Sequence, residues 1–162
     1  MSSSKMEIET AEKVLTIRRV FDAPRELVFE TFTTCDHLAN WWGPREWPLA
    51  SCQMDFREGG IWSYCMQGPE GQLSCGKALY QRIQQPELIQ FEDYFTDEAG
   101  QVNPEFPSSV STYQFTEQGD QTLFTGRTEY REAADLQKVL EMGVVAGMTE
   151  TLDRLEEHLA TL

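Results

Sequence analysis

The sequence predicts an α+β fold: a curved antiparallel sheet of six or seven strands, with two short helices after the first strand and one long C-terminal helix packed across the sheet. Between Trp47 and Tyr130, apolar and polar residues alternate, as they do in strands with one buried face. Mostly short turn signals separate these segments, and short turns join antiparallel neighbours. From about Ala133 the apolar residues instead repeat with the period of a helix.

The first elements are a strand and two short helices. The strand is predicted from about Lys13 to Phe21, where β-forming residues predominate. Asp22-Ala23-Pro24 then supplies a cap and a helix start, and apolar residues at helical spacing continue to about Thr31. A second short helix is predicted from Asp36 to Trp42. Residues 1–12 are expected to form a flexible tail.

The central part of the chain is predicted to supply the rest of the sheet. One strand follows Trp47, where Cys52, Met54 and Phe56 alternate with polar residues. A longer loop is expected from Asp97 to Ser108, because glycine and prolines interrupt the pattern there. The remaining strands are predicted at Ile61–Gln67, Gln72–Ile83, Leu88–Phe95, Val110–Thr116 and Thr122–Tyr130.

The C-terminal segment, from about Ala133 to Leu162, has the clearest helical pattern in the chain. At ~1.5 Å per residue this helix is roughly 40 Å long, whereas six strands at ~4.8 Å spacing form a sheet about 25 to 30 Å wide. A position along the sheet is therefore needed to bury the apolar stripe. The stripe comprises Leu136, Val139, Leu140, Gly143, Val144, Met148, Leu152, Leu155 and Leu159.

Length and charge narrow the class of protein. A chain of 162 residues suits one domain, expected over residues 13–162. The formal net charge of -14 repels phosphates and anionic head groups, which argues against nucleic acid and membrane surfaces as partners. No apolar run approaches the ~20 residues that cross a bilayer, and the first residues lack the apolar core of a signal peptide. We therefore expect no membrane insertion and a cytoplasmic location.

Neither the cysteines nor the histidines form a recognisable site in the sequence. The cysteines, Cys35, Cys52, Cys65 and Cys75, contain no CxxC pair, so they are expected to be reduced and buried. His37 and His158 lie in different predicted helices without a paired ligand motif. No metal and no cofactor is therefore predicted.

Small residues face each other where the C-terminal helix should meet the sheet. Gly126 lies between bulky residues of the last predicted strand, and the helical stripe carries Gly143, with Gly147 near its edge. Such positions leave either close backbone contact or empty volume. A glycine costs ~1 kcal/mol in a helix interior relative to alanine, so two of them need a compensating benefit. Because a strongly curved sheet cannot press on a straight helix everywhere, we favour a pocket.

Four segments resemble, in the same order, those of a known family. They are Val20–Phe29 with Phe32-Thr33, His37–Pro44, Met54–Trp62 and Gly147–Leu155. Over roughly residues 13–160 the chain resembles the activator of heat-shock protein 90 ATPase homologue-like (AHSA-like) domains of the START/SRPBCC superfamily. The resemblance implies the helix-grip fold of the birch-pollen allergen.

Two points limit what the resemblance implies. Met148 stands where the family often has Trp, and the flexible methionine gives the pocket a different shape there. In the eukaryotic chaperone activator, a separate N-terminal domain makes much of the contact with the chaperone. We therefore do not predict chaperone activation from the family name.

No catalytic residue is assigned, but a set of residues is predicted to line a ligand site. Adjacent helical residues point about 100° apart, so at most one of Trp41 and Trp42 points fully at the core. The other packs under a loop or walls the pocket mouth. The predicted ligand-binding residues are Trp41, Trp42, Met54, Trp62, Tyr64, Phe91, Asp93, Tyr113, Phe115, Gly126, Gly143, Val144 and Met148.

Asp93 is the polar member of this set. It shares its strand parity with Phe91 and Phe95, and an inward carboxylate needs a partner, which Arg82 or Arg127 could supply. Arg57 and Glu92 could also offer polar contacts to a ligand, but a solvated sheet face explains those two residues equally well.

The leading hypothesis is a cytoplasmic module that binds a small hydrophobic molecule in an apolar pocket of ~300 to 1,000 Å³. One alternative is an enzyme of the aromatase, cyclase or hydratase type, with Asp93, Tyr64 or Tyr113 as acid or base. The other is a protein-interaction domain, either chaperone-associated or a homodimer.

Overall fold

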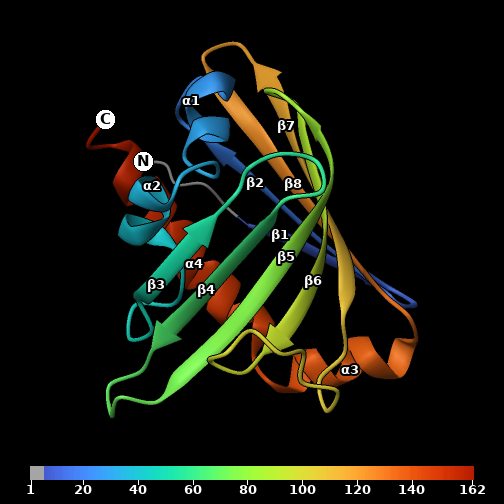
Figure 1. The fold of residues 1–162 in the computed structure, drawn as a ribbon. Coiled ribbons are helices and arrows are strands. Elements are labelled where there is room, and N and C mark those ends of the chain that lie inside the picture. The colour runs from blue at the N-terminus through green and yellow to red at the C-terminus, as the bar shows by residue number, and fades with distance from the viewer. Residues whose placement is uncertain (1–5) are drawn as a thin grey trace.

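In the computed structural model, which describes residues 6–162, a curved sheet of eight antiparallel strands wraps around helices on its inner side (Figure 1). The strand order is β1-β2-β8-β7-β6-β5-β4-β3, so β1 and β3 are the edges. The predicted α+β class, with an open antiparallel sheet and a C-terminal helix, is confirmed. The elements are β1 Glu7–Ala11, β2 Val14–Phe21, α1 Arg25–Glu30, α2 Cys35–Trp41, β3 Leu49–Met54, β4 Ile61–Gln67, β5 Leu73–Gln84, β6 Leu88–Thr96, β7 Ser109–Gln118, β8 Gln121–Tyr130, α3 Ala133–Glu141 and α4 Val144–Leu159.

The predicted number of strands, six or seven, is wrong because β1 adds an eighth. This strand pairs with β2, from Glu7 opposite Arg18 to Ala11 opposite Val14. It lies in the segment 1–12 predicted as a flexible tail, of which residues 1–5 are outside the described part of the chain. All five residues of β1 are exposed, so the strand has no buried face to produce an apolar alternation. The two short helices consequently follow the second strand instead of the first.

The short helices α1 and α2 lie close to their predicted positions. Helix α2 begins after Thr34, whose hydroxyl accepts a hydrogen bond from the backbone N–H of His37. The indole Nε1 of Trp41 donates to the carbonyl oxygen of Thr31, which ties α2 to the end of α1. Trp41 is fully buried and therefore anchors the helix.

The single long C-terminal helix predicted from Ala133 to Leu162 is wrong. The chain forms α3 and α4 instead, separated by Gly143 with a left-handed φ of 88°. A left-handed residue ends one helix and turns the chain into the next, and glycine adopts it without a Cβ penalty. Both helices turn apolar residues inward, Val139 in α3 and Leu152 and Leu155 in α4. The apolar period therefore runs through the bend and conceals it in the sequence.

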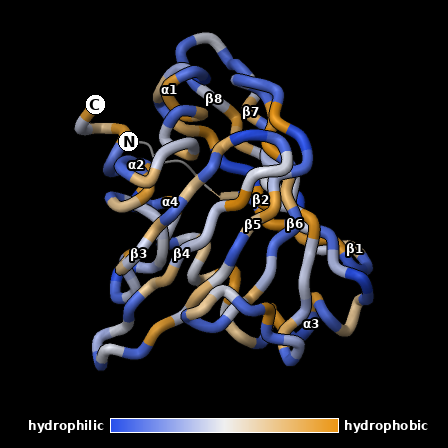
Figure 2. Tube along the Cα trace, in the orientation of Figure 1, coloured by the Kyte–Doolittle hydropathy of each residue, from blue (hydrophilic) through white to orange (hydrophobic). Residues whose placement is uncertain are grey.

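Aromatic rings fill the interior at the α1 end. Hydrophobic and hydrophilic residues alternate along the strands (Figure 2), and in β2 every second residue is buried. Phe32 lies between four rings, with centroid distances of 4.8 Å to Trp41, 5.1 Å to Phe115, 5.5 Å to Phe124 and 5.6 Å to Tyr113. We call this end the aromatic end; its phenylalanines are Phe21, Phe29, Phe32, Phe115 and Phe124.

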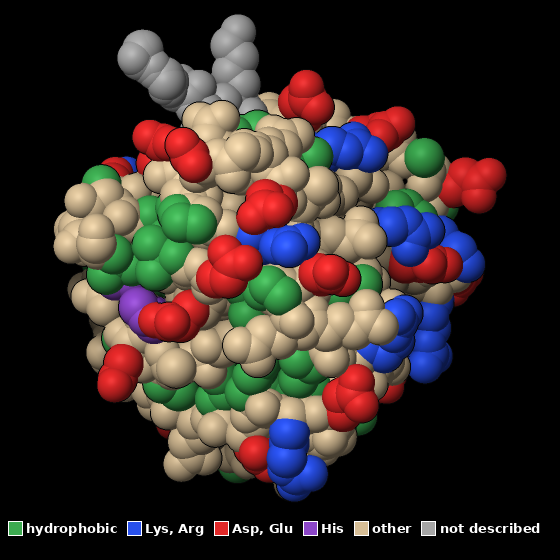
Figure 3. All heavy atoms as spheres, turned by 90° about the horizontal axis from the view of Figure 1, so that it is seen from above, with side chains coloured by type: hydrophobic (Ala, Val, Ile, Leu, Met, Phe, Trp, Pro, Cys, Tyr) green, Lys and Arg blue, Asp and Glu red, His purple; other side chains and the backbone are tan. Residues whose placement is uncertain are grey.

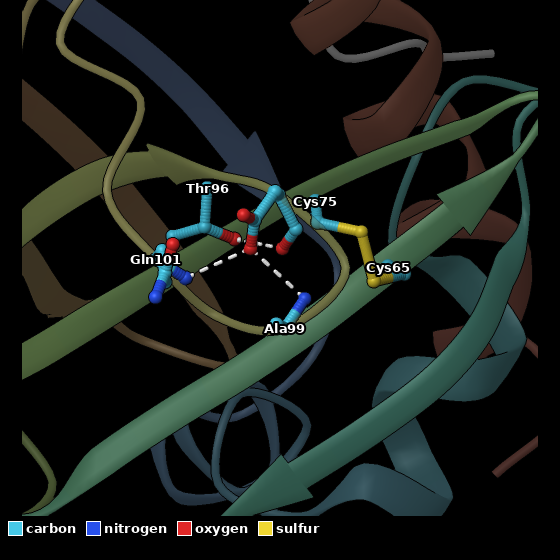
Figure 4. The surroundings of a disulfide bond; sticks show 6 residues. Cys65, Cys75, Thr96, Ala99 and Gln101 are labelled. Carbon is cyan, nitrogen blue, oxygen red and sulfur yellow. Dashed lines mark hydrogen bonds between the residues drawn. A yellow bond between two sulfur atoms is a disulfide. The ribbon is translucent and has the colours of Figure 1, made fainter.

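All four cysteines are in disulfides, so the expectation of reduced thiols is wrong for the structure. Cys35–Cys52 joins α2 to β3, and Cys65–Cys75 joins β4 to β5 beside the loop that follows Thr96 (Figure 4). Cys65 and Cys75 are directly opposite in the hairpin, equally far from its turn. The equal distance of Cys65 and Cys75 from the turn could be read from the sequence. The Cys35–Cys52 pair could not, because the approach of α2 to β3 depends on tertiary packing.

Candidate functional site

A hollow of about 210 Å³ lies between the sheet and the junction of α3 and α4, at the opposite end of the interior from the aromatic end. Strand β6 and the neighbouring ends of β7 and β8 form its floor, and the two C-terminal helices form its roof. Its lining residues are Asp93, Phe95, Pro107, Ser109, Tyr130, Val139, Met142, Gly143 and Val144.

The bend at Gly143 is the reason for the hollow. No heavy atom lies within 4 Å of the position that a Cβ on Gly143 would occupy, so this glycine borders open space. Beyond the bend, α4 packs mainly against α2 and α3 and its backbone stays away from the strands. Gly147 behaves differently, because a Cβ there would contact Pro44 at 3.6 Å.

Asp93 points to the inner face of the sheet, as its parity with Phe91 and Phe95 suggested. Its neighbours across the strands are Ala78 and Ser109, neither of which carries a charge. Burial raises the pKa of the Asp93 carboxyl to about 7, partly opposed by a hydrogen bond from the Tyr94 backbone. The acid therefore changes its charge close to neutral pH.

The expected arginine partners of Asp93 are elsewhere. Arg82 is exposed, and exposed Arg127 bonds to Glu129. Among residues 6–162, no ion pair includes Asp93. Within this part of the chain the carboxyl therefore has no opposite charge beside it, although the Tyr94 backbone donates a hydrogen bond to it.

The charge of this carboxyl acts on three tyrosines, of which Tyr130 lines the hollow with it. Burial raises the pKa of Tyr64 and Tyr113 well above the ordinary range, and that of Tyr130 to about 12, with the charge of Asp93 adding to each shift. All three phenols stay protonated at neutral pH and can donate a hydrogen bond. A hollow lined by one titrating acid and one phenol can orient a polar ligand group or exchange a proton with it.

Arginine side chains hold α4 in place, a feature that sequence reasoning missed. Arg19 is almost fully buried on the inner face of β2 and donates to Asp153 at 2.7 Å and to Glu156 at 3.1 Å. Arg154 donates to the carbonyl oxygens of Asn40, Trp42 and Gly43 at the end of α2. The parity of Arg19 with Ile17 and Phe21 was a signal that it points inward.

The predicted ligand-binding residues fall into separate regions. Asp93, Gly143 and Val144 line the hollow. Trp42, Trp62 and Tyr64 form a ring cluster, with centroids 4.9 Å apart for the first pair and 4.6 Å for the second. Met54 and Met148 are half-buried against the core. The others, Trp41, Phe91, Tyr113, Phe115 and Gly126, are buried in the packed interior.

Gly126 accommodates neighbouring rings instead of widening a cavity. A Cβ there would meet Phe124 at 3.2 Å and Tyr113 at 3.5 Å. The hollow in turn uses residues that sequence reasoning did not select, chiefly Ser109 and Tyr130. Tyr130 stands opposite Ser109, which stands opposite Asp93, so cross-strand register would have found both.

A larger hollow of about 410 Å³ lies over β3, β4 and β5, near the Cys65–Cys75 disulfide (Figure 4). Polar residues such as Ser51, Gln53 and Ser63 line it together with the 97–100 loop. In that loop, the carboxylate of Asp97 accepts from the backbone of Ala99 and Gln101. We regard the hollow beside Gly143 as the candidate site, because its lining is the more apolar of the two and the loop carboxylate at the larger hollow already accepts two hydrogen bonds.

The two histidines, predicted in different helices without a paired ligand motif, are adjacent in the structure. Nδ1 of His37 lies 2.9 Å from Nε2 of His158, and Nε2 of His37 lies 3.2 Å from Glu30. A histidine beside an acidic side chain is visible on the face over α1 and α2 (Figure 3). Within residues 6–162, no three His, Cys, Asp or Glu side chains are arranged to hold a metal ion. That part of the chain also contains no helix that is long and apolar enough to cross a membrane.

Comparison with known proteins supports one family. Residues 22–160 match the family model described as Activator of Hsp90 ATPase homolog 1-like protein. A solved structure from Mycobacterium smegmatis is 29% identical with a TM-score of 0.88, covering 96% of this chain and 96% of that one. One from Arthrobacter aurescens is 26% identical with a TM-score of 0.90, covering 96% and 92%. One from Staphylococcus epidermidis is 28% identical with a TM-score of 0.83, covering 96% and 94%. No curated protein matches.

Proposed function

We propose, from the premise that this chain belongs to the Activator of Hsp90 ATPase homolog 1-like family, of the START/SRPBCC type, that it binds a small hydrophobic molecule between the sheet and the C-terminal helices. The observation that carries this proposal is the hollow beside Gly143. Its apolar walls include Phe95, Val139 and Val144, and its few polar groups converge on Asp93. Such a combination is typical of sites that bind small molecules.

The size of the hollow restricts the ligand. Its volume of about 210 Å³ is below the ~300 Å³ at which ligand pockets usually begin, so the expected 300 to 1,000 Å³ is too large. A molecule built around one substituted ring fits the volume. A larger ligand requires α4 to move at Gly143.

The direct test combines native mass spectrometry with a variant that fills the hollow. Freshly purified protein is expected to retain a small molecule, and Val144→Trp is expected to lose it because the indole occupies the hollow. Ala146→Trp is the matched control, since Ala146 is exposed on the same helix. Equal retention by wild type and Val144→Trp would contradict the proposed position of the ligand.

A proton-transfer enzyme is a second candidate, favoured by the Asp93 carboxyl with its pKa of about 7 next to protonated phenols. An acid that titrates near the working pH is suited to general acid or base catalysis. Here Asp93 is the proposed base and Tyr113 or Tyr64 the proposed donor. If the wild type returns a retained molecule in altered form while Asp93→Asn returns it unchanged, the function is catalytic.

The cytoplasm is the proposed location, and the disulfides make it testable. Cytosolic reductants keep cysteine thiols reduced, so a cytoplasmic protein is expected to carry free cysteines in cells. Rapid alkylation of intact cells followed by mass spectrometry measures this. Four cysteines that remain unalkylated because they are in disulfides would place the protein in an oxidising compartment.

A homodimer is a further proposed assembly, because the edge strands β1 and β3 have no neighbour on their outer sides within the described chain. Sedimentation at micromolar concentration tests it.

A further inference from the structure

The carboxyl of Asp93 lacks a positive partner within the described chain. It lies in the middle of the inner face, with Ala78 on one side and Ser109 on the other. Arg19, the cation buried on the same face, is already committed to Asp153 and Glu156. A carboxylate in an apolar setting is unfavourable unless a charge or several hydrogen bonds compensate it.

The surrounding phenols satisfy only part of this requirement. Tyr64, Tyr113 and Tyr130 can donate hydrogen bonds, but a neutral phenol brings no positive charge. Ser109 donates a hydrogen bond to the Tyr130 oxygen, which leaves the Tyr130 O–H free to donate. A cation is the partner that would compensate the ionised form of this carboxyl.

Resting on the proposed function, we propose that the ligand carries a basic nitrogen attached to an apolar body, and that Asp93 binds this nitrogen. Phe95, Val139 and Val144 then enclose the apolar part. The net charge of -14 attracts a cation toward the protein and repels an anion. The carboxylate of Asp93 also repels ligands that offer a carboxylate at the same place.

Three probes of one shape test this: 2-phenylethylamine, ethylbenzene and phenylacetate, each measured by calorimetry with the full chain. At pH 8 the amine is expected to bind at least about tenfold more tightly than ethylbenzene, and phenylacetate more weakly than either. At pH 6 the advantage of the amine falls about tenfold, because an acid with a pKa near 7 is then mostly protonated. The affinity of ethylbenzene stays nearly constant.

Asp93→Asn keeps the shape of the side chain and removes its charge. The variant is expected to bind amine and ethylbenzene equally at both pH values. Glu92→Gln is the matched control and keeps the wild-type pattern, because Glu92 bonds to Gln81 and Tyr94 away from the hollow.

The outcomes separate this inference from the proposed function. Equal binding of amine and ethylbenzene by the wild type at pH 8 overturns the inference and leaves the proposed function intact. An amine preference that survives in Asp93→Asn also overturns it. If none of the three probes binds, the proposed function and the inference both fail.

Discussion

The two ends of the interior are built from the same sheet but closed in different ways. At the aromatic end, α1 lies directly on β7 and β8, and Phe29 contacts Phe115 with ring centroids 5.3 Å apart. At the other end, α3 and α4 meet at Gly143 and leave the hollow beside Asp93. Acidic and basic side chains are intermixed on the surface over the aromatic end (Figure 3).

This difference shows that the close-packed rings and the open volume lie at separate ends of the same sheet. Close-packed rings at one end contribute burial and ring contacts. The hollow end instead keeps a carboxyl without an ion pair in the described chain and a left-handed glycine, features that do not improve stability. Variants at the two ends should therefore differ in the size and the sign of their effects.

The largest effect is expected from Phe32→Ala at the aromatic end. Phe32 is 5% exposed and contacts four rings, so its removal leaves a cavity that costs about 3 to 5 kcal/mol of unfolding free energy. Urea unfolding measures this loss. Met142→Ala at the hollow end is the control and is expected to cost less than about 0.5 kcal/mol, since Met142 is 49% exposed. Similar losses in the two variants would remove the contrast between the ends.

The next effect concerns the disulfide that secures α2 beside the aromatic end. Cys35–Cys52 closes 17 residues, and replacing both cysteines by serine is expected to cost about 3 kcal/mol in unfolding measured without reductant. The pair Cys65→Ser and Cys75→Ser should cost less, because the hairpin already holds these positions opposite each other. A larger loss of stability from the Cys65/Cys75 double variant would show that the β4–β5 hairpin depends more on its disulfide than α2 does.

Asp93→Asn is expected to stabilise the protein, in a pH-dependent way. The ordinary pKa of 3.8 is raised to about 7 in the folded chain, so the folded protein holds a proton that the unfolded chain has lost between these values. Stability therefore falls as pH rises through this window, and the penalty is complete above pH 7. Asparagine removes it, with a gain of about 2 to 3 kcal/mol at pH 8 and less than half of that at pH 4.5.

The measurement is the free energy of unfolding by urea at several pH values. Glu92→Gln, the matched change on the same strand, should leave the shape of the profile unaltered. A loss of stability at pH 8 in Asp93→Asn would mean that a cation or a donor already satisfies the carboxylate.

The smallest effects distinguish the two glycines of the C-terminal segment. Gly143→Ala is expected to lower stability by about 1 kcal/mol, because alanine is strained at a φ of 88° even though its Cβ meets open space. Gly147→Ala is expected to raise it by up to about 1 kcal/mol, since the residue is helical and its Cβ makes an ordinary contact with Pro44. Melting curves give both signs. The sequence placed Gly143 inside one long helix, where a larger side chain adopts the backbone conformation without strain. At the observed φ of 88°, Gly143→Leu is instead expected to lower stability.

The sequence predicted the parts of this molecule that depend on local pattern. Alternation located seven of the eight strands, and parity placed Asp93 on the inner face with Phe91. Strand β1 was missed because an exposed edge strand shows no apolar period. The bend at Gly143 was missed because a glycine in an unbroken stripe looks the same in a helix and at a left-handed turn.

The candidate site was harder to predict than the fold. Trp62 and Phe115 share their parity with true lining residues, and sequence cannot tell which stretch of a strand lies under the bend. Whether Asp93 has a partner depends on side chains from other strands, and both arginines considered for it point elsewhere. The register between strands determines these neighbours. Predicting it requires the position and length of each turn to within one residue, which the sequence pattern does not give.

The way α4 is fastened determines how the interior can be reached. Arg19 and Arg154 connect residues 153–156 to β2 and α2, about ten residues and ~15 Å along the helix from Gly143. A tilt of about 10° around these fastenings displaces the Gly143 end by roughly 2.5 Å, given that length. We therefore expect that a ligand of the proposed kind reaches the hollow by a tilt of α4 at Gly143, with the contacts of Arg19 and Arg154 kept in place.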